Sequence, residues 1–123
     1  MSNRVAVYGT LKRGYGANSM LADATCLGRG TTVPSYQMTD VGFPMIEPDD
    51  DGHRIRVEVY DEPNWKVLDR YEGVPSLYQR RIVPVELDSG ETVEAYIYEA
   101  TNISGSPVEP SDGVLEWGAS RGY

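Results

Sequence analysis

Glu72 is the residue whose position best suits proton-transfer chemistry. A helix is expected to begin at residues 61–63 and to run to about Tyr71. Trp65, Leu68 and Glu72 share its apolar face through their i, i+3, i+7 spacing, so Glu72 is expected to point inward. Burial and the negative helix end both raise the pKa of a carboxyl, which suits a general acid and base. The alternative is that the helix ends earlier and leaves Glu72 exposed.

The turn formed by Gly9, Thr10 and Leu11 is the second candidate, because it follows an apolar run that predicts a buried strand over residues 4–8. Backbone N–H groups exposed in such a turn can bind a carboxylate without any cationic side chain. A plain strand-to-loop turn is the alternative. Two further aromatic residues are either core side chains or sources of a hydroxyl for a pocket, namely Tyr8 and Tyr78.

Other kinds of site are disfavoured by the residues that they would need. His53 is the only histidine and follows a glycine turn, which is a poor place to orient a catalytic base or a zinc ligand. The acidic run at residues 49–51 lacks the spacing of a calcium loop. The glycine turn at residues 9–14 does not continue as an ATPase phosphate loop. The residues therefore favour neither a metal site of these kinds nor an ATPase-type phosphate loop.

The composition narrows the class of protein. The chain has 123 residues, enough for one domain over residues 1–123, and a formal charge of −8. That charge argues against nucleic acid and anionic membranes as partners, although a locally positive pocket can still hold a small anion. Cys26 is alone, so no intrachain disulfide can form, and no apolar run reaches membrane-spanning length or resembles a signal peptide. We expect a cytoplasmic protein.

Strands outnumber helices in the expected order of elements. Apolar runs and alternation predict strands at residues 4–8, 26–33, 36–38, 55–60, 78–87 and 92–99. A short helix at residues 19–22 is expected to be capped by Asn18, and the turn at residues 49–52 to join a hairpin. The expected fold class is α+β: a small mixed or antiparallel β-barrel with one or two short flanking helices.

The last part of the chain has no clear periodicity. After Ala100 the sequence is rich in Gly, Ser and Pro, with scattered large apolar residues. Three of these are expected to anchor the tail on the body: Leu115, Trp117 and Tyr123.

Several stretches in order resemble the γ-glutamylcyclotransferase-like proteins, also called the AIG2-like family. VYGTLKRG at residues 7–14 resembles that family's substrate loop, and LDRYEGVPSLYQRRIVPV at residues 68–85 resembles its catalytic stretch. Weaker similarities are GFPMI at residues 42–46, VEVYD at 57–61 and EAYIYEA at 94–100. The resemblance is nearest to the γ-glutamylamine cyclotransferases and leaves the tail, residues 101–123, unmatched.

The resemblance implies a reaction on a small γ-glutamyl amide or peptide. The α-carboxylate would bind the backbone of Gly9, Thr10 and Leu11, and the α-amine would attack the side-chain carbonyl to release 5-oxoproline and an amine. Glu72 would be the catalytic acid and base, with Tyr8 and Tyr78 in the substrate site, and no cofactor would be needed. A non-catalytic binding module for a γ-glutamyl or other acidic ligand is the alternative. The amine and the oligomeric state are left open.

Overall fold

The computed structural model describes residues 3–118 and has a closed barrel with a small sheet beside it. Five strands form the barrel, with β1 pairing with both β5 and β7 and thereby closing the order β1-β7-β6-β2-β5. The β1–β7 pair is parallel and its neighbours in the barrel are antiparallel, so the expected mixed barrel is confirmed. Their bounds are β1 Arg4–Val7, β2 Thr25–Thr32, β5 Arg54–Asp61, β6 Tyr78–Leu87 and β7 Thr92–Ala100.

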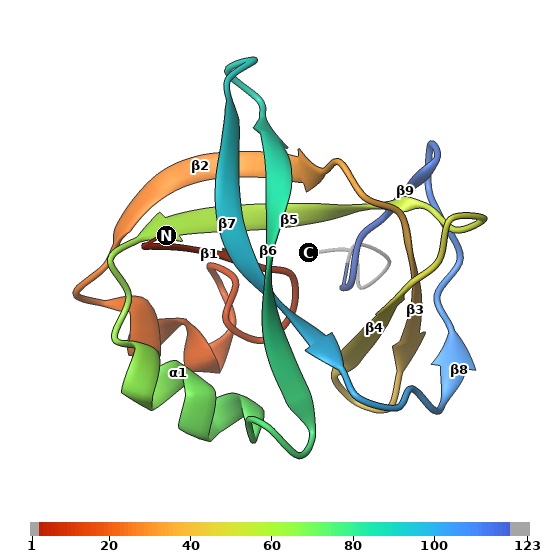
Figure 1. The fold of residues 1–123 in the computed structure, drawn as a ribbon, viewed down its shortest axis with the longest axis horizontal. Coiled ribbons are helices and arrows are strands. Elements are labelled where there is room, and N and C mark those ends of the chain that lie inside the picture. The colour runs from red at the N-terminus through yellow and green to blue at the C-terminus, as the bar shows by residue number, and fades with distance from the viewer. Residues whose placement is uncertain (1–2, 119–123) are drawn as a thin grey trace.

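The remaining elements lie around this barrel (Figure 1). The helix α1 crosses below the barrel strands, and the small sheet lies to the right in the figure. No helix among residues 3–118 has both the length and the apolar character needed to cross a bilayer. The bounds are β3 Tyr36–Asp40, β4 Pro44–Pro48, β8 Ser106–Pro107, β9 Val114–Leu115, the 3₁₀ helix η1 Gly16–Leu21 and α1 Trp65–Glu72.

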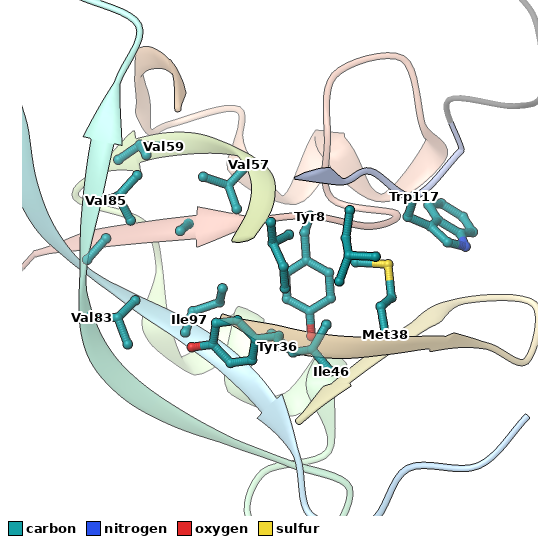
Figure 2. Close-up of a cluster of buried hydrophobic side chains, with 14 of the residues drawn as sticks. Tyr8, Tyr36, Met38, Ile46, Val57, Val59, Val83, Val85, Ile97 and Trp117 are labelled. Atoms are coloured by element: carbon teal, nitrogen blue, oxygen red, sulfur yellow. The ribbon is translucent and has the colours of Figure 1, made fainter. Parts of the chain in front are cut away.

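The alternation of side chains on each strand builds two cores. On β1, Ala6 faces the barrel interior, as does Tyr8 just beyond it, whereas Val5 and Val7 face outward. The inner core is filled mainly by branched side chains from β5, β6 and β7, among which Tyr8 and Tyr36 lie (Figure 2). The outer core packs α1 against the barrel through Leu68, which is fully buried. The end of β1 therefore lies where both cores meet.

Helix α1 begins later than the sequence predicts. Asp61 still belongs to β5, and the N-cap is Asn64, whose side-chain oxygen accepts a hydrogen bond of 3.3 Å from the amide of Val67. The side chain of an N-cap asparagine can accept a hydrogen bond from a free amide of the first helical turn. Asp61 and Glu62 precede Pro63 and are too far from these amides to do so. The end is as predicted, because Gly73 adopts φ 68° and stops the helix directly after Glu72.

Replacing Asn64 by alanine is expected to lower the free energy of unfolding by about 1 kcal/mol, because the helix loses its side-chain cap. Urea unfolding of the wild type and the Asn64→Ala variant measures this loss. The exposed Asn102, outside any helix, supplies the control Asn102→Ala, for which no comparable loss is expected. Equal losses in the two variants would contradict the cap assignment.

Two local predictions are wrong. The hairpin expected across residues 49–52 does not form, since β4 pairs with β3 while β5 pairs with β1 and β2. The tight connection lies instead at residues 41–43, between β3 and β4, where the Gly42 amide donates a hydrogen bond to the Asp40 carboxylate. Strand β4 is therefore already paired with β3. Asn18 does not cap the first helix, which starts at Gly16 without a side-chain cap; its amide nitrogen donates to the carbonyl of Leu11, 2.8 Å away.

The tail carries two short strands that the sequence does not reveal. Residues 106–107 add to the edge of β3 in the small sheet, and residues 114–115 run parallel to the start of β5. Leu115 and Trp117 are buried, as predicted, whereas Tyr123 lies outside the described residues. The tail therefore packs against the end of the barrel that faces the small sheet.

Candidate active site

One cavity of about 300 Å³ brings the six predicted site residues together. It lies between the end of β1, the end of α1 and the connection between β3 and β4. The predicted residues that line it are Tyr8, Gly9, Thr10, Leu11, Glu72 and Tyr78. Further lining comes from Ala6, Val7, Gly42, Phe43, Pro44, Tyr71, Leu77 and Tyr98. The turn at Gly9 to Leu11 and the Glu72 side chain thus line the same cavity.

The loop segment that follows β1, Gly9 to Leu11, presents free backbone amides. Two of its carbonyls are occupied, because Gly9 accepts from the Lys12 amide at 3.0 Å and Leu11 accepts from Asn18 at 2.8 Å. Within residues 3–118, the three N–H groups of Gly9, Thr10 and Leu11 donate to no protein acceptor. Successive unpaired amides of this kind favour an anion, and they need one if water is displaced.

Glycine is required at position 9 by close packing. A Cβ atom there would lie 2.6 Å from Cγ and 2.9 Å from Cδ of Pro44, closer than real Cβ contacts come. The Pro44 carbonyl in turn accepts a hydrogen bond of 2.7 Å from the Tyr78 hydroxyl, which helps to fix the position of the proline. The loop and the start of β4 therefore form a tightly packed wall.

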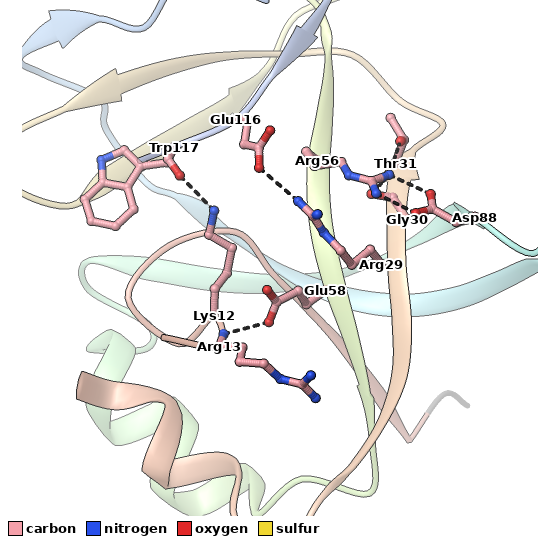
Figure 3. Close-up of polar contacts among 10 residues, drawn as sticks. All are labelled: Lys12, Arg13, Arg29, Gly30, Thr31, Arg56, Glu58, Asp88, Glu116 and Trp117. Carbon is pink, nitrogen blue, oxygen red and sulfur yellow. Dashed lines mark hydrogen bonds and ion pairs between the residues drawn. The ribbon is translucent and has the colours of Figure 1, made fainter. Parts of the chain in front are cut away.

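The back of the loop is held by groups that do not line the cavity (Figure 3). Lys12 is 7% exposed, and its ammonium donates to the carbonyl of Trp117 at 2.7 Å. Burial lowers the pKa of this lysine. The amide of Arg13 donates to the Glu58 carboxylate at 2.7 Å. The side chains of Lys12 and Arg13 therefore do not line the cavity, so no cationic side chain of the loop faces it.

Glu72 supplies the single carboxyl among the described residues that line the cavity. It is half-buried at the last residue of α1, and among residues 3–118 no group forms a hydrogen bond or ion pair with it. Burial raises its pKa from 4.5 to about 7. Burial raises the pKa values of the phenols of Tyr8, Tyr78 and Tyr98, and the nearby Glu72 carboxylate raises them further. A carboxyl with this pKa can both accept and return a proton near neutral pH.

The tyrosines have roles in both the core and the cavity. Tyr8 is buried in the barrel core and donates its phenol proton to the carbonyl of Tyr98. Tyr78 donates to the carbonyl of Pro44. A phenol whose proton is committed in this way offers its remaining lone pairs as acceptors. The two hydroxyl oxygens therefore suit a ligand that carries N–H donors.

Several residues that line the cavity are not among the site residues that the sequence predicts. Phe43, Tyr71 and Leu77 stay 39%, 41% and 41% exposed and form an apolar part of the lining. The Tyr71 hydroxyl also lies 2.7 Å from Oγ1 of Thr10, and this contact joins α1 to the loop that follows β1. Phe43 lies in the β3–β4 connection, Tyr71 on α1 and Leu77 between α1 and β6, so their placement around one cavity depends on the closed barrel. Local patterning cannot place them side by side.

Comparisons with known proteins bear on the family and the fold. Residues 5–117 match the family described as "Gamma-glutamyl cyclotransferase, AIG2-like". A gamma-glutamylaminecyclotransferase of Rattus norvegicus is 34% identical over 112 residues, which cover 76% of this chain and 75% of the rat protein. A crystal structure of an AIG2-like protein from Mus musculus superposes with a TM-score of 0.73 at 31% identity and covers 83% of this chain and 79% of its own. An uncharacterised protein from Pyrococcus horikoshii gives 0.63 at 27% identity, over 87% and 86% of the two chains.

Proposed function

The chain belongs to the AIG2-like gamma-glutamyl cyclotransferase family, and on that premise we propose that it cyclises the glutamyl group of a γ-glutamyl amide. The products are 5-oxoproline and a free amine. The observation that carries the proposal is the lone Glu72 carboxyl, which shares one cavity with three unpaired backbone amides. A γ-glutamyl group has an α-carboxylate for the amides and an α-ammonium for the acid.

The α-carboxylate is assigned to the amides of Gly9, Thr10 and Leu11. No Lys or Arg side chain is among the described residues that line the cavity, so backbone groups are the available donors for an anion. The α-ammonium then lies toward Glu72, where the hydroxyl oxygens of Tyr8 and Tyr78 accept hydrogen bonds. Binding at both ends fixes the rotamer in which the amine faces the side-chain carbonyl.

Glu72 is assigned the proton transfers. It takes a proton from the α-ammonium, and the freed amine attacks the γ-carbonyl carbon and forms a five-membered ring. The amide C–N bond then breaks, and the carboxyl returns the proton to the departing nitrogen. In two such transfers, two protons pass from the α-nitrogen to the leaving nitrogen, and no water is consumed.

The attack is intramolecular, which limits what the protein must supply. Oriented intramolecular reactions reach effective molarities on the order of 10⁵ M or more. Orientation and one well-placed acid are therefore sufficient chemistry for a site whose described lining contains no histidine, cysteine or lysine.

The pH dependence of kcat/KM follows from the pKa of Glu72. The base form is the unprotonated one, so kcat/KM is expected to rise about tenfold per pH unit in acid and to level off near pH 7. The donor's own α-ammonium ionises well above this range and stays constant across the acid limb. Initial rates of 5-oxoproline release from pH 4.5 to 8.5 measure the limb. An acid limb with its midpoint at the ordinary glutamate value would contradict a buried base.

A panel of γ-glutamyl donors tests the proposal. It should include amides of alkylamines, of lysine side chains, of polyamines and of peptides, with 5-oxoproline detected by mass spectrometry. Release from at least one donor is expected, and the same release without protein is the baseline. Calorimetric binding of these donors without any 5-oxoproline would favour the non-catalytic binding module instead.

A further inference from the structure

A cluster of five polar and aromatic side chains ties α1 to the barrel one turn before Glu72. Asp69 lies on α1 three residues ahead of Glu72, and its Oδ1 accepts a hydrogen bond of 2.7 Å from the hydroxyl of Tyr98. Arg80 on β6 contacts the same carboxylate through two nitrogens, with Nε 2.8 Å from Oδ1 and Nη2 3.0 Å from Oδ2. Such two-point contacts between guanidinium and carboxylate fix orientation as well as distance.

Two aromatic rings hold the guanidinium of Arg80. It lies 4.3 Å from the ring centre of Trp65, the first residue of α1, and 4.8 Å from that of Tyr96 on β7. The two rings also contact each other edge to face, with centres 5.2 Å apart. The guanidinium therefore touches both turns of the helix, at Trp65 and at Asp69, while it is anchored in β6.

The charged side chains of this cluster are partly shielded from solvent. The side chains of Arg80 and Asp69 are 27% and 28% exposed, so their charges are partly desolvated and depend on each other. Helix α1 has only eight residues, of which Leu68 is the single buried apolar one. A helix this short is marginal on its own and depends on its tertiary contacts. The Asp69–Arg80 contact is thus a two-point polar link between α1 and β6, in addition to the single contact of Tyr71 with Thr10.

We propose that Asp69 and Arg80 are positioning residues, which hold α1 so that the Glu72 carboxyl lies inside the cavity. This inference rests on the proposed function of Glu72. Residues three apart on a helix lie on one face, so a rotation that releases Asp69 also moves Glu72. Tyr98 connects the two regions, because its ring lines the cavity while its hydroxyl binds Asp69. The groups that face Glu72 from the other elements are the neutral phenols of Tyr8, Tyr78 and Tyr98.

The Asp69→Asn variant tests the positioning role through the titration of Glu72. It keeps the side-chain shape and removes the charge that Arg80 binds. When the helix end becomes more mobile and the carboxyl more hydrated, the pKa of Glu72 is expected to fall by about one unit or more toward 4.5. Carbon-13 NMR titration of the glutamate carboxyls reads this directly, with the Glu72→Gln variant identifying the resonance. The same variant is expected to lower kcat roughly 10- to 100-fold with little change in KM.

Asp88→Asn is the matched control. It breaks another pair between an aspartate and an arginine, that of Asp88 with Arg56, at the far end of β6 from Arg80. The Glu72 titration and kcat are expected to stay at their wild-type values in this variant. If Asp69→Asn does not fold, Arg80→Lys replaces it, because lysine keeps the charge and loses the two-nitrogen contact.

The outcomes separate this inference from the proposed function. A Glu72 titration that is unchanged in Asp69→Asn and in Arg80→Lys overturns the positioning role, whatever the activity of the variants. Absence of 5-oxoproline release by the wild type, together with a shifted titration in the variants, overturns the proposed function and leaves the positioning of Glu72 supported.

Discussion

The Glu72→Gln variant is expected to bind γ-glutamyl donors and to release 5-oxoproline at least about 10³-fold more slowly than the wild type. Glutamine keeps the size and most of the packing of the side chain but cannot take up the proton of the α-ammonium. Among the described residues that line the cavity, Glu72 is the single carboxyl, so no neighbour replaces it there. Single-turnover 5-oxoproline release measures the rate, and calorimetry measures binding.

The same variant also serves as its own control for folding. The pKa of Glu72 is raised from 4.5 to about 7, so the folded state keeps a proton that the unfolded state has released. The stability that protonated Glu72 contributes is fully present below pH 4.5 and is lost as the pH rises through about 7. At pH 8 the variant is therefore expected to be more stable than the wild type, by up to on the order of 3 kcal/mol.

Thermal or urea unfolding at pH 4 and pH 8 measures this difference. A variant with wild-type stability at pH 4, higher stability at pH 8 and no 5-oxoproline release is the expected set of results. Full 5-oxoproline release by a folded Glu72→Gln variant would contradict the assignment of Glu72.

The second large effect is expected for Gly9→Val, with KM raised roughly 10- to 100-fold or binding lost. The added side chain collides with Pro44, whose Cγ would be 2.6 Å from the new Cβ, so the amides of the loop must move away from the anion. Loss of a charge-assisted hydrogen bond from such an amide is worth about 1.5–3 kcal/mol. Steady-state KM and calorimetric affinity measure the effect.

A carboxamide analogue and a second glycine make this test specific. A donor whose α-carboxylate is replaced by a carboxamide should bind the wild type weakly and lose little more affinity in Gly9→Val. Gly16→Val is the control, since a Cβ at Gly16 meets no atom within 4 Å and that residue lies outside the cavity. An unchanged KM in Gly9→Val, or the same loss for both donors, would count against anion binding at the loop.

Elements with strong local patterns could be predicted from the sequence. The alternation of Val57 and Val59 on β5 and of Val93 and Ala95 on β7 predicts strands, and their buried side chains confirm them. The glycine stop at Gly73 also decides where α1 ends. These signals come from neighbouring residues, so they do not depend on how the chain closes.

Features that depend on long-range pairing could not be predicted. The turn at residues 49–52 has the composition of a hairpin, yet β4 had already paired with β3 through the shorter connection at residues 41–43. Asn18 has the residue type of a cap, but the Leu11 carbonyl competes for its side chain. In both cases a local preference is satisfied by a different partner.

The candidate site shows the same division. The acid at the end of α1 attracts notice in the sequence because it breaks local preferences, whereas the turn after β1 does so because it follows a buried strand. Tyr98 and Phe43 enter the cavity from β7 and from the β3–β4 connection, and nothing in their own neighbourhood indicates this. A closed barrel is needed to bring them to the same space.

The most direct test of the central claim is a crystal structure of Glu72→Gln with an uncleaved γ-glutamyl amide. The account predicts that the α-carboxylate accepts hydrogen bonds from the amides of Gly9, Thr10 and Leu11, with the α-nitrogen beside residue 72 and facing the γ-carbonyl carbon. A glutamyl group bound outside this cavity, or bound with its carboxylate toward residue 72, would contradict the account.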